Sequence, residues 1–310
     1  RTMELLKAEN IHKSYYNHVA LNDVSISIKE NSIFGLLGPN GAGKTSFIRL
    51  ITQITAPDSG KIFFKGERLG QQHISKIGYL PEERGLYKKM KVGEQCLYLA
   101  QLKGMTEKQA KQSLKEWFEK FEIQSWWNKK VQDLSKGMQQ KIQFVSTVMH
   151  EPELLILDEP FSGFDPINTE LIKKEIQELH AKGTTIIFST HNMESVEEIC
   201  TEIALINKSE KILGGNINDI KQEHKKGIYE IRFNGNWINF SNALWTGFEM
   251  LSQEEINGQL VATVKANKEH KSSDLLAAIN PTVNITQFRE VIPTMNEIFI
   301  DNVVNANSHE

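Results

Sequence analysis

Two kinds of apolar pattern predict that the first two thirds of the chain contain several strands. Val24, Ile26 and Ile28 alternate with polar positions, as in an antiparallel strand buried on one face. Residues 33–37 are continuously apolar and run into a glycine-rich turn, which is typical of a parallel strand buried on both faces. Two further buried strands are predicted at 154–157 and 184–189, with a helical pattern at 170–180 between them. This βαβ order predicts a parallel sheet.

The middle of the chain, about residues 92–150, has helical patterns and lacks strand patterns. Thr106 and Gln109 have the spacing of a capping box, in which each side chain bonds to the backbone N–H of the other residue. The helix that follows carries apolar residues three and four positions apart, namely Leu114, Trp117, Phe118 and Phe121. Its aromatic residues could form a ligand platform, but the spacing favours an amphipathic face that packs into the core.

The character of the chain changes again after residue 215. Residues 229–233 and 260–264 alternate like strands, and 274–279 have the pattern of a short helix. We therefore predict a small α+β domain at 224–303, joined through the polar stretch 221–227 to a larger domain at 3–220. Trp237, Trp245 and Phe248 could form a surface for a partner, but core packing is the favoured interpretation.

Length and charge exclude some classes of protein. The 310 residues suggest two domains. With 36 Lys and Arg against 39 Asp and Glu, the formal net charge is −3, which argues against binding nucleic acid or an anionic membrane through bulk positive charge. No apolar run reaches the roughly 18–20 residues that cross a bilayer. The two cysteines, Cys96 and Cys200, are far apart, which fits a reducing cytoplasm better than a disulfide framework.

The turn after residues 33–37 fits the phosphate-loop pattern G-x-x-x-x-G-K-[ST]. Its glycines allow backbone N–H groups to surround phosphate oxygens, and a helix N-terminus behind them adds positive potential. Lys44 can reach the β- and γ-phosphates, and the Thr45 hydroxyl can bind Mg²⁺. The predicted nucleotide-binding residues here are Gly38, Pro39, Asn40, Gly41, Ala42, Gly43, Lys44, Thr45 and Ser46.

Polar residues end the other two buried strands. Asp158 and Glu159 follow residues 154–157, and His191 follows residues 184–189. Asp158 would lie beside the phosphate loop and hold Mg²⁺ directly or through water. Glu159 can orient and deprotonate an attacking water. His191 can contact the γ-phosphate and that water, so Lys44, Glu159 and His191 are the predicted catalytic residues.

With these elements in this order, residues 4–215 resemble the nucleotide-binding subunits of ABC transporters. The resemblance adds Leu-Ser-Lys-Gly-Met-Gln-Gln at 134–140, Ser-Gly-Phe-Asp at 162–165, and Tyr15. In that family the first segment is the signature that clamps the γ-phosphate bound to the opposite subunit, and it implies roles for Ser135, Lys136, Gly137 and Met138. Ser135 can also cap the helix that follows. The second segment corresponds to the D-loop with Asp165, and Tyr15 to the aromatic residue that stacks on adenine.

Three positions depart from the family pattern. Lys136 replaces the first glycine of the signature and Met138 replaces its glutamine. Glu82 occupies the place of the Q-loop glutamine, where the resemblance implies a ligand of Mg²⁺. The amino-acid sequences of residues 78–87 and 293–300 resemble those of the NatA-like branch of exporter ATPases, and this resemblance implies export.

The resemblance implies an α/β P-loop NTPase fold of ABC type, with a parallel core sheet, an antiparallel β subdomain, a helical subdomain at about 92–150 and a small C-terminal α+β domain. It implies that ATP and Mg²⁺ bind to a head-to-tail dimer with a second copy or a paralogous ATPase subunit, on the inner face of the membrane beside a multi-span permease. No nucleic acid is expected. The alternatives are a soluble ABC-type ATPase that acts on DNA or ribosomes, and a regulatory ATP-binding module without turnover.

Overall fold

The computed structural model describes residues 3–83, 85–162 and 165–308, with side chains up to 304. The chain divides into two compact units, Arg1–Ile217 and Asn218–Glu310. Among the described residues, no helix is both long enough and apolar enough to cross a membrane.

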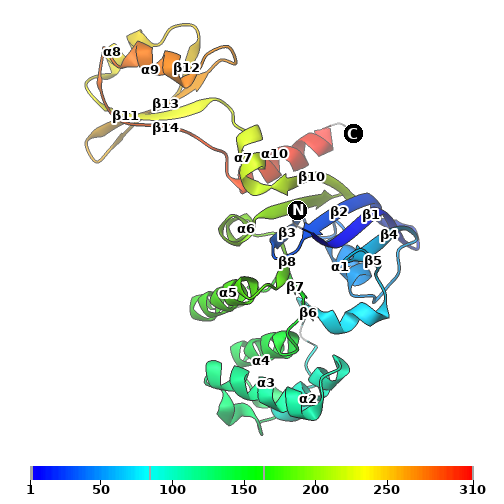
Figure 1. Ribbon diagram of the computed structural model, residues 1–310. Coiled ribbons are helices and arrows are strands. Elements are labelled where there is room, and N and C mark those ends of the chain that lie inside the picture. The colour runs from blue at the N-terminus through cyan, green and yellow to red at the C-terminus, as the bar shows by residue number, and fades with distance from the viewer. Residues whose placement is uncertain (1–2, 84, 163–164, 309–310) are drawn as a thin grey trace. The chain divides into compact units, whose positions relative to one another are not determined.

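The first unit is built on a six-stranded sheet whose order is β10-β9-β3-β8-β7-β6 (Figure 1). Its strands are β3 Ile33–Leu37, β6 Ile77–Leu80, β7 Leu154–Asp158, β8 Thr185–Thr190, β9 Glu202–Asn207 and β10 Glu210–Asn216. All neighbouring pairs are parallel except β9 and β10. Every residue of β3, β7 and β8 is buried, which confirms the predicted parallel strands. Leu37 pairs with Thr190 and Asp158 with Ser189, so the segments that follow these strands emerge at one edge of the sheet.

An antiparallel sheet, β2-β1-β4-β5, packs against helix α1. Its strands are β1 Glu4–Tyr15, β2 His18–Lys29, β4 Ser59–Phe64 and β5 Glu67–Arg68, and α1 spans Lys44–Ile51. Val24, Ile26 and Ile28 of β2 are buried beside Phe47 and Ile48 of α1, so the alternation predicted for β2 is confirmed. One apolar core therefore holds the hairpin and the helix after the phosphate loop.

The middle of the chain is helical, as predicted (Figure 1). It contains α2 Val92–Leu102, α3 Glu107–Lys120 and α4 Lys136–Val148, with short 3₁₀ turns at Gln124–Trp126 and Val131–Asp133; a further 3₁₀ turn, Gln71–Lys76, precedes β6. Thr106 and Gln109 form the predicted capping box at the start of α3. Leu114, Phe118 and Phe121 are buried, and Trp117 packs edge-on against Phe121 and Phe144, so this face packs into the core. Two more helices, α5 Pro166–Ala181 and α6 Met193–Ile199, follow β7 and β8.

The second unit contains a four-stranded antiparallel sheet, β12-β13-β11-β14. Along the chain it reads β11 Ile228–Asn234, α8 Trp237–Ala243, β12 Phe248–Ile256, β13 Gln259–Ala266, α9 Ser272–Ile279 and β14 Asn284–Glu290, followed by α10 Met295–Ser308. This βαββαβ order is that of ferredoxin-like domains. Figure 1 shows α8 and α9 on one face of the sheet. The predicted α+β class of this domain is therefore confirmed.

Two details of this part differ from the sequence interpretation. The polar stretch at 221–227 begins inside helix α7, Ile217–Glu223, because Ile217 and Ile220 provide a buried face. Phe248 is buried and Trp237 is partly buried in the core of the second unit, so the core packing favoured from the sequence is confirmed for these two residues. Trp245 does not: 47% of its surface is exposed, although its ring packs edge-on against Phe248 and His270.

Candidate functional site

The phosphate loop connects the end of β3 to the start of α1. Gly38 and Gly43 both have positive φ angles, +150° and +121°. A β-carbon on Gly38 would lie 2.1 Å from the carbonyl oxygen of Ile206, and one on Gly43 would lie 2.5 Å from that of Ala20. Glycine is therefore required at both positions, because the backbone has no room and the conformation is disfavoured for other residues.

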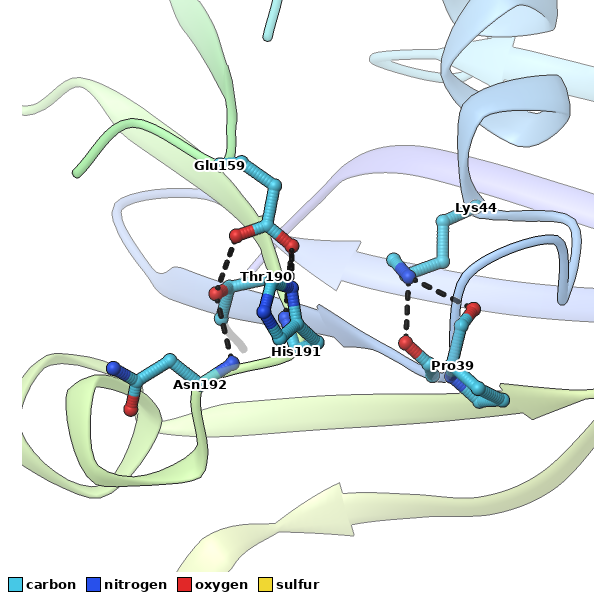
Figure 2. A network of polar contacts seen from close by, with 7 residues as sticks. Pro39, Lys44, Glu159, Thr190, His191 and Asn192 are labelled. Atoms are coloured by element: carbon cyan, nitrogen blue, oxygen red, sulfur yellow. Dashed lines mark hydrogen bonds and ion pairs between the residues drawn. The ribbon is translucent and has the colours of Figure 1, made fainter. Parts of the chain in front are cut away.

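Lys44 lies within the loop, with only 7% of its surface exposed. Its Nζ donates to the carbonyl oxygen of Gly38 at 2.6 Å and to that of Pro39 at 3.1 Å (Figure 2). Burial lowers the pKa of Lys44, and the carboxylates of Glu159 and Asp158 oppose that shift. A desolvated ammonium group is thus held where the loop turns toward the end of β7.

A cavity of about 180 Å³ lies in front of the loop. Its lining residues are His18, Ala20, Asn40, Gly41, Gly43, Lys44, Thr45, Ser46, Glu82, Asp158 and Glu159. The fold thus brings together four segments of the sequence: the start of β2, the loop, the residues after β6 and the end of β7.

Three oxygen-bearing side chains on this wall could hold a divalent cation. Asp158 is 6% exposed, and burial raises its pKa, with the charges of Glu159 and Glu82 adding to the rise. A cation between these carboxylates would offset the electrostatic cost of keeping Asp158 ionised. A hydroxyl and carboxylates are ligands that Mg²⁺ prefers, and Mg²⁺ is usually bound through one or two carboxylates together with phosphate oxygens. The donors of Thr45, Asp158 and Glu82 therefore fit Mg²⁺.

Glu159 follows β7 with a left-handed backbone, at φ +47°. Its N–H donates to the carbonyl oxygen of Ser189 at 2.8 Å, which holds it against β8. Oε2 accepts from the Thr190 hydroxyl at 3.0 Å, and Oε1 accepts from the backbone N–H of His191 at 2.9 Å (Figure 2). Nδ1 of His191 lies 2.6 Å from Oε1. The structure thus places Glu159 and His191 in direct contact, with Glu159 on the cavity wall and the imidazole 61% exposed.

Tyr15 is not part of the cavity wall. Its ring lies 5.3 Å from Nζ of Lys13, and its buried hydroxyl has no hydrogen-bond partner among the described residues. The same hairpin contributes His18 and Ala20 to the wall, and sequence reasoning missed both. The alternation of β2 was the available signal, because residues 18 and 20 share a strand face. The register adds that His18 lies opposite Tyr15.

The signature residues occupy the N-terminus of α4. Ser135 caps the helix, and its hydroxyl accepts from the backbone N–H of Met138 at 3.2 Å. Ser135 and Lys136 are exposed, and Gly137 and Met138 are half-buried. Within the described part of the chain, none of these four residues lines the cavity of the phosphate loop.

Asp165 caps α5 in the same way. One of its carboxylate oxygens accepts from the N–H groups of Ile167 and Asn168, both at 3.0 Å, and the other accepts from the Asn168 side-chain amide at 2.5 Å. Gly163 and Phe164 of the predicted D-loop, and Arg84 beside the predicted Q-loop, lie outside the described residues.

Comparison with known proteins identifies the larger unit. The family model described as ABC transporter matches residues 21–162. YhaQ of Bacillus subtilis, named as an ABC transporter ATP-binding protein, is 40% identical over 299 residues, which cover 96% of this chain and 98% of YhaQ. The chain belongs to the ABC transporter ATP-binding proteins. The predicted resemblance is therefore confirmed.

Further comparisons agree with this assignment. The ABC transporter ATP-binding protein NatA of Bacillus subtilis is 31% identical over 210 residues, covering 66% of this chain and 85% of NatA. A solved structure of the ATP-binding subunit of an ABC transporter superposes with a TM-score of 0.66 at 29% identity, over 71% of this chain and 92% of that one. The predicted ABC-type fold is confirmed. A model described as the C-terminal domain of ATP-binding proteins like DrrA1-3 matches residues 215–303 of this ABC protein.

Proposed function

We propose that this ABC ATP-binding subunit hydrolyses ATP with Mg²⁺ in its domain at 3–220. The observation that carries the proposal is the shared cavity, whose wall contains the phosphate loop, Lys44, Thr45, Asp158 and Glu159. Phosphate oxygens would meet backbone N–H groups of the loop, the N-terminus of α1 and the Lys44 ammonium. Mg²⁺, held by Thr45, Asp158 and Glu82, would neutralise charge on the β- and γ-phosphates.

Glu159 is the proposed general base. Its carboxylate stands at the cavity wall and is oriented by hydrogen bonds from Thr190 and His191. A carboxylate held in this way can orient a water toward the γ-phosphate and accept its proton. His191 fixes the carboxylate and is exposed enough to contact the phosphate as well.

The active form is proposed to be a head-to-tail dimer, formed by two copies or with a paralogous subunit. The exposed N-terminus of α4 carries Ser135 and Lys136 and lies apart from the chain's own cavity. It therefore suits an anion supplied by a second subunit, because a helix N-terminus with free N–H groups attracts negative charge.

A permease partner is supported by an apolar cavity of about 350 Å³ on the same unit. Tyr79, Pro81, Gly85 and Leu86 line it, so it shares with the nucleotide site the segment that carries Glu82. Ile54 and Leu102, which are exposed, also line this cavity. We propose that a cytoplasmic segment of a multi-span permease docks here, placing the subunit on the inner face of the membrane, and that the pair exports its substrate, as the NatA-like sequence features imply.

Two measurements test this proposal. Phosphate release from the purified chain should require both ATP and Mg²⁺, and a chain without turnover would favour a regulatory ATP-binding module. Detergent co-purification should recover a multi-span protein. Leu102→Asp, at an exposed position in the apolar cavity, should abolish recovery, whereas Ile238→Asp, at an exposed position in the second unit, should not. Recovery of nucleic acid or ribosomes in place of a membrane protein would favour the soluble alternative.

A further inference from the structure

Helix α2 ends at a lysine whose ammonium group lies against two backbone carbonyls. Lys103 is the C-terminal cap residue of the helix. Its Nζ donates to the carbonyl oxygen of Ile77 at 2.8 Å and to that of Ile74 at 3.2 Å. The side chain is partly buried, and this burial lowers the pKa of Lys103. Because an ammonium group has three N–H donors, one donor remains for a further acceptor.

No carboxylate among the described residues compensates the charge of Lys103. Lysines elsewhere in the first unit have such a partner. Nζ of Lys173, which is also partly buried, lies 2.6 Å from a carboxylate oxygen of Glu198. Nζ of Lys120 lies 2.5 Å from a carboxylate oxygen of the buried Glu175. Since charges removed from water are usually paired, Lys103 is one half of an ion pair whose other half this part of the chain does not supply.

Lys103 lies on the wall of the apolar cavity of about 350 Å³ that Leu86 and Leu102 also line. Among the lining residues that the structure describes, it is the one that carries a charge at neutral pH. The other titratable base, His150, is neutral there, because burial and the charge of Lys103 lower its pKa to about 4. Ile54 and Leu102 remain exposed at this surface. The cavity therefore combines uncovered apolar side chains with one uncompensated cation.

This combination restricts what can cover the cavity. A segment that buries Ile54 and Leu102 also removes water from the ammonium group of Lys103. If that segment were wholly apolar, the desolvated charge would be left unpaired, which is strongly unfavourable. An amide or hydroxyl oxygen would accept from the third N–H but would leave the charge uncompensated. A carboxylate supplies both the acceptor and the opposite charge.

We infer that the permease segment that docks in this cavity carries an aspartate or glutamate among its apolar residues, and that this carboxylate pairs with Lys103. Docking of a permease here is the proposed function on which this inference rests. Lys103 then determines partner specificity, because a segment without the carboxylate would leave the ammonium group unpaired in the interface.

The test is zero-length cross-linking of the complex that co-purifies in detergent. A carbodiimide activates a carboxylate, and a lysine amine in contact with it displaces the activating group as a urea and forms an amide bond. Mass spectrometry should find Lys103 joined to an aspartate or glutamate of the multi-span protein. The amide between Lys120 and Glu175 is the positive control in the same sample, because this pair is already in contact within the chain. The chain alone should give no cross-link from Lys103 to the residues described above.

Three variants separate the charge of Lys103 from its bulk. Lys103→Met should lower recovery of the multi-span protein by about 10- to 100-fold, because a charge-assisted hydrogen bond is lost. Lys103→Arg keeps the charge and should retain recovery, but it should give no amide because a guanidinium group does not react in this way. Lys173→Met is the matched control: it removes a partly buried lysine whose partner, Glu198, belongs to the same chain, and it should leave recovery unchanged.

Charge exchange completes the test. Lys103→Glu should abolish recovery, and replacing the cross-linked permease carboxylate by lysine should restore it. If Lys103→Met does not fold, Lys103→Arg and the cross-link still decide. A recovered complex in which Lys120 reacts with Glu175 but Lys103 does not react with the permease would overturn the inference.

Two other outcomes would also overturn it. One is recovery by folded Lys103→Met that equals the wild type. The other is binding of the purified chain to phosphatidylglycerol vesicles that Lys103→Met abolishes, which would assign the cation to a lipid phosphate. Failure of the proposed partner is recognised separately, because the wild type would then recover no multi-span protein, and the pairing of Lys103 would fall with it.

Discussion

Glu159 and His191 are joined twice, through the backbone N–H of His191 at 2.9 Å and through its Nδ1 at 2.6 Å, both to the same carboxylate oxygen. Both residues follow neighbouring parallel strands, so the register of the sheet creates the pair. The contact fixes the direction of the Glu159 carboxylate before any ligand enters. A preorganised base of this kind loses little freedom when the water is bound.

Glu159→Gln should stop hydrolysis while leaving ATP binding intact. The amide keeps the shape and can still accept from the His191 N–H, but it cannot take a proton from water. We expect the turnover rate to fall by about 10²-fold or more, and ATP·Mg²⁺ should now hold two chains together on gel filtration. Turnover at the wild-type rate would refute the role of Glu159, and a persistent monomer would count against the dimer.

Lys44→Ala should weaken ATP binding itself. The change removes the one loop cation that faces Glu159 and Asp158, so the phosphates would meet these carboxylates without compensation. Loss of charge-assisted hydrogen bonds predicts about a 10- to 100-fold lower affinity by calorimetry. Lys111→Ala, at an exposed position of α3, is the control. Equal affinities of the two variants would show that Lys44 does not face the nucleotide.

Gly137→Asp should act on the partner's nucleotide site. The variant chain keeps its own phosphate loop, so its affinity for ATP should be near normal. Its carboxylate would stand where the signature meets the γ-phosphate of the other subunit, and hydrolysis should be lost by repulsion. Gly137→Ala separates charge from bulk, because its β-carbon would lie 3.3 Å from the Asn168 amide, which can yield by a few tenths of an ångström. Outright loss of ATP binding by the aspartate variant would place Gly137 in the local site instead.

Glu82 should make ATP binding unusually dependent on Mg²⁺. Its carboxylate lies on the cavity wall with Asp158 and Glu159. When Mg²⁺ is present, its positive charge favours the ionised form of Glu82. When Mg²⁺ is absent, three carboxylates face the γ-phosphate, and repulsion between like charges weakens ATP binding. Glu82→Gln should remain an active ATPase with a weaker metal requirement. Superimposable curves of ATP affinity against Mg²⁺ for the two proteins would mean that Glu82 is not at the metal.

His150 should make the fold less stable in mild acid. Burial, assisted by the charge of Lys103, lowers the pKa of His150 to about 4. An unfolded histidine titrates near 6.5, so between these values the unfolded chain binds the extra proton and stability falls as the pH falls. At pH 5 the loss is about 2 kcal/mol relative to neutral pH. Urea unfolding at pH 7.5 and 5.0 should show this loss in the wild type and not in His150→Gln; equal losses would refute it.

Much of this protein can be predicted locally from its sequence. The continuously apolar run at 33–37 requires burial on both faces, so it predicts a parallel strand without knowledge of its neighbours. The capping box at Thr106 and Gln109 formed where the sequence placed it, because its bonds join residues three positions apart. The phosphate loop is similarly contained in eight consecutive residues.

Tertiary structure decided which residues that are remote in sequence lie close to these segments. Glu82 and Asp158 are far apart in the chain and meet only because β6 and β7 are parallel neighbours. His18 lines the cavity because the antiparallel hairpin places Ala20 against Gly43, whereas the alternation of β2 indicates only that residues 18 and 20 share a strand face. The bond from Gln140 to Ser162 likewise joins a helix to a turn 22 residues away. Local propensity fixes which elements form, whereas strand order and packing set these distances, and they depend on contacts between residues that are remote in sequence.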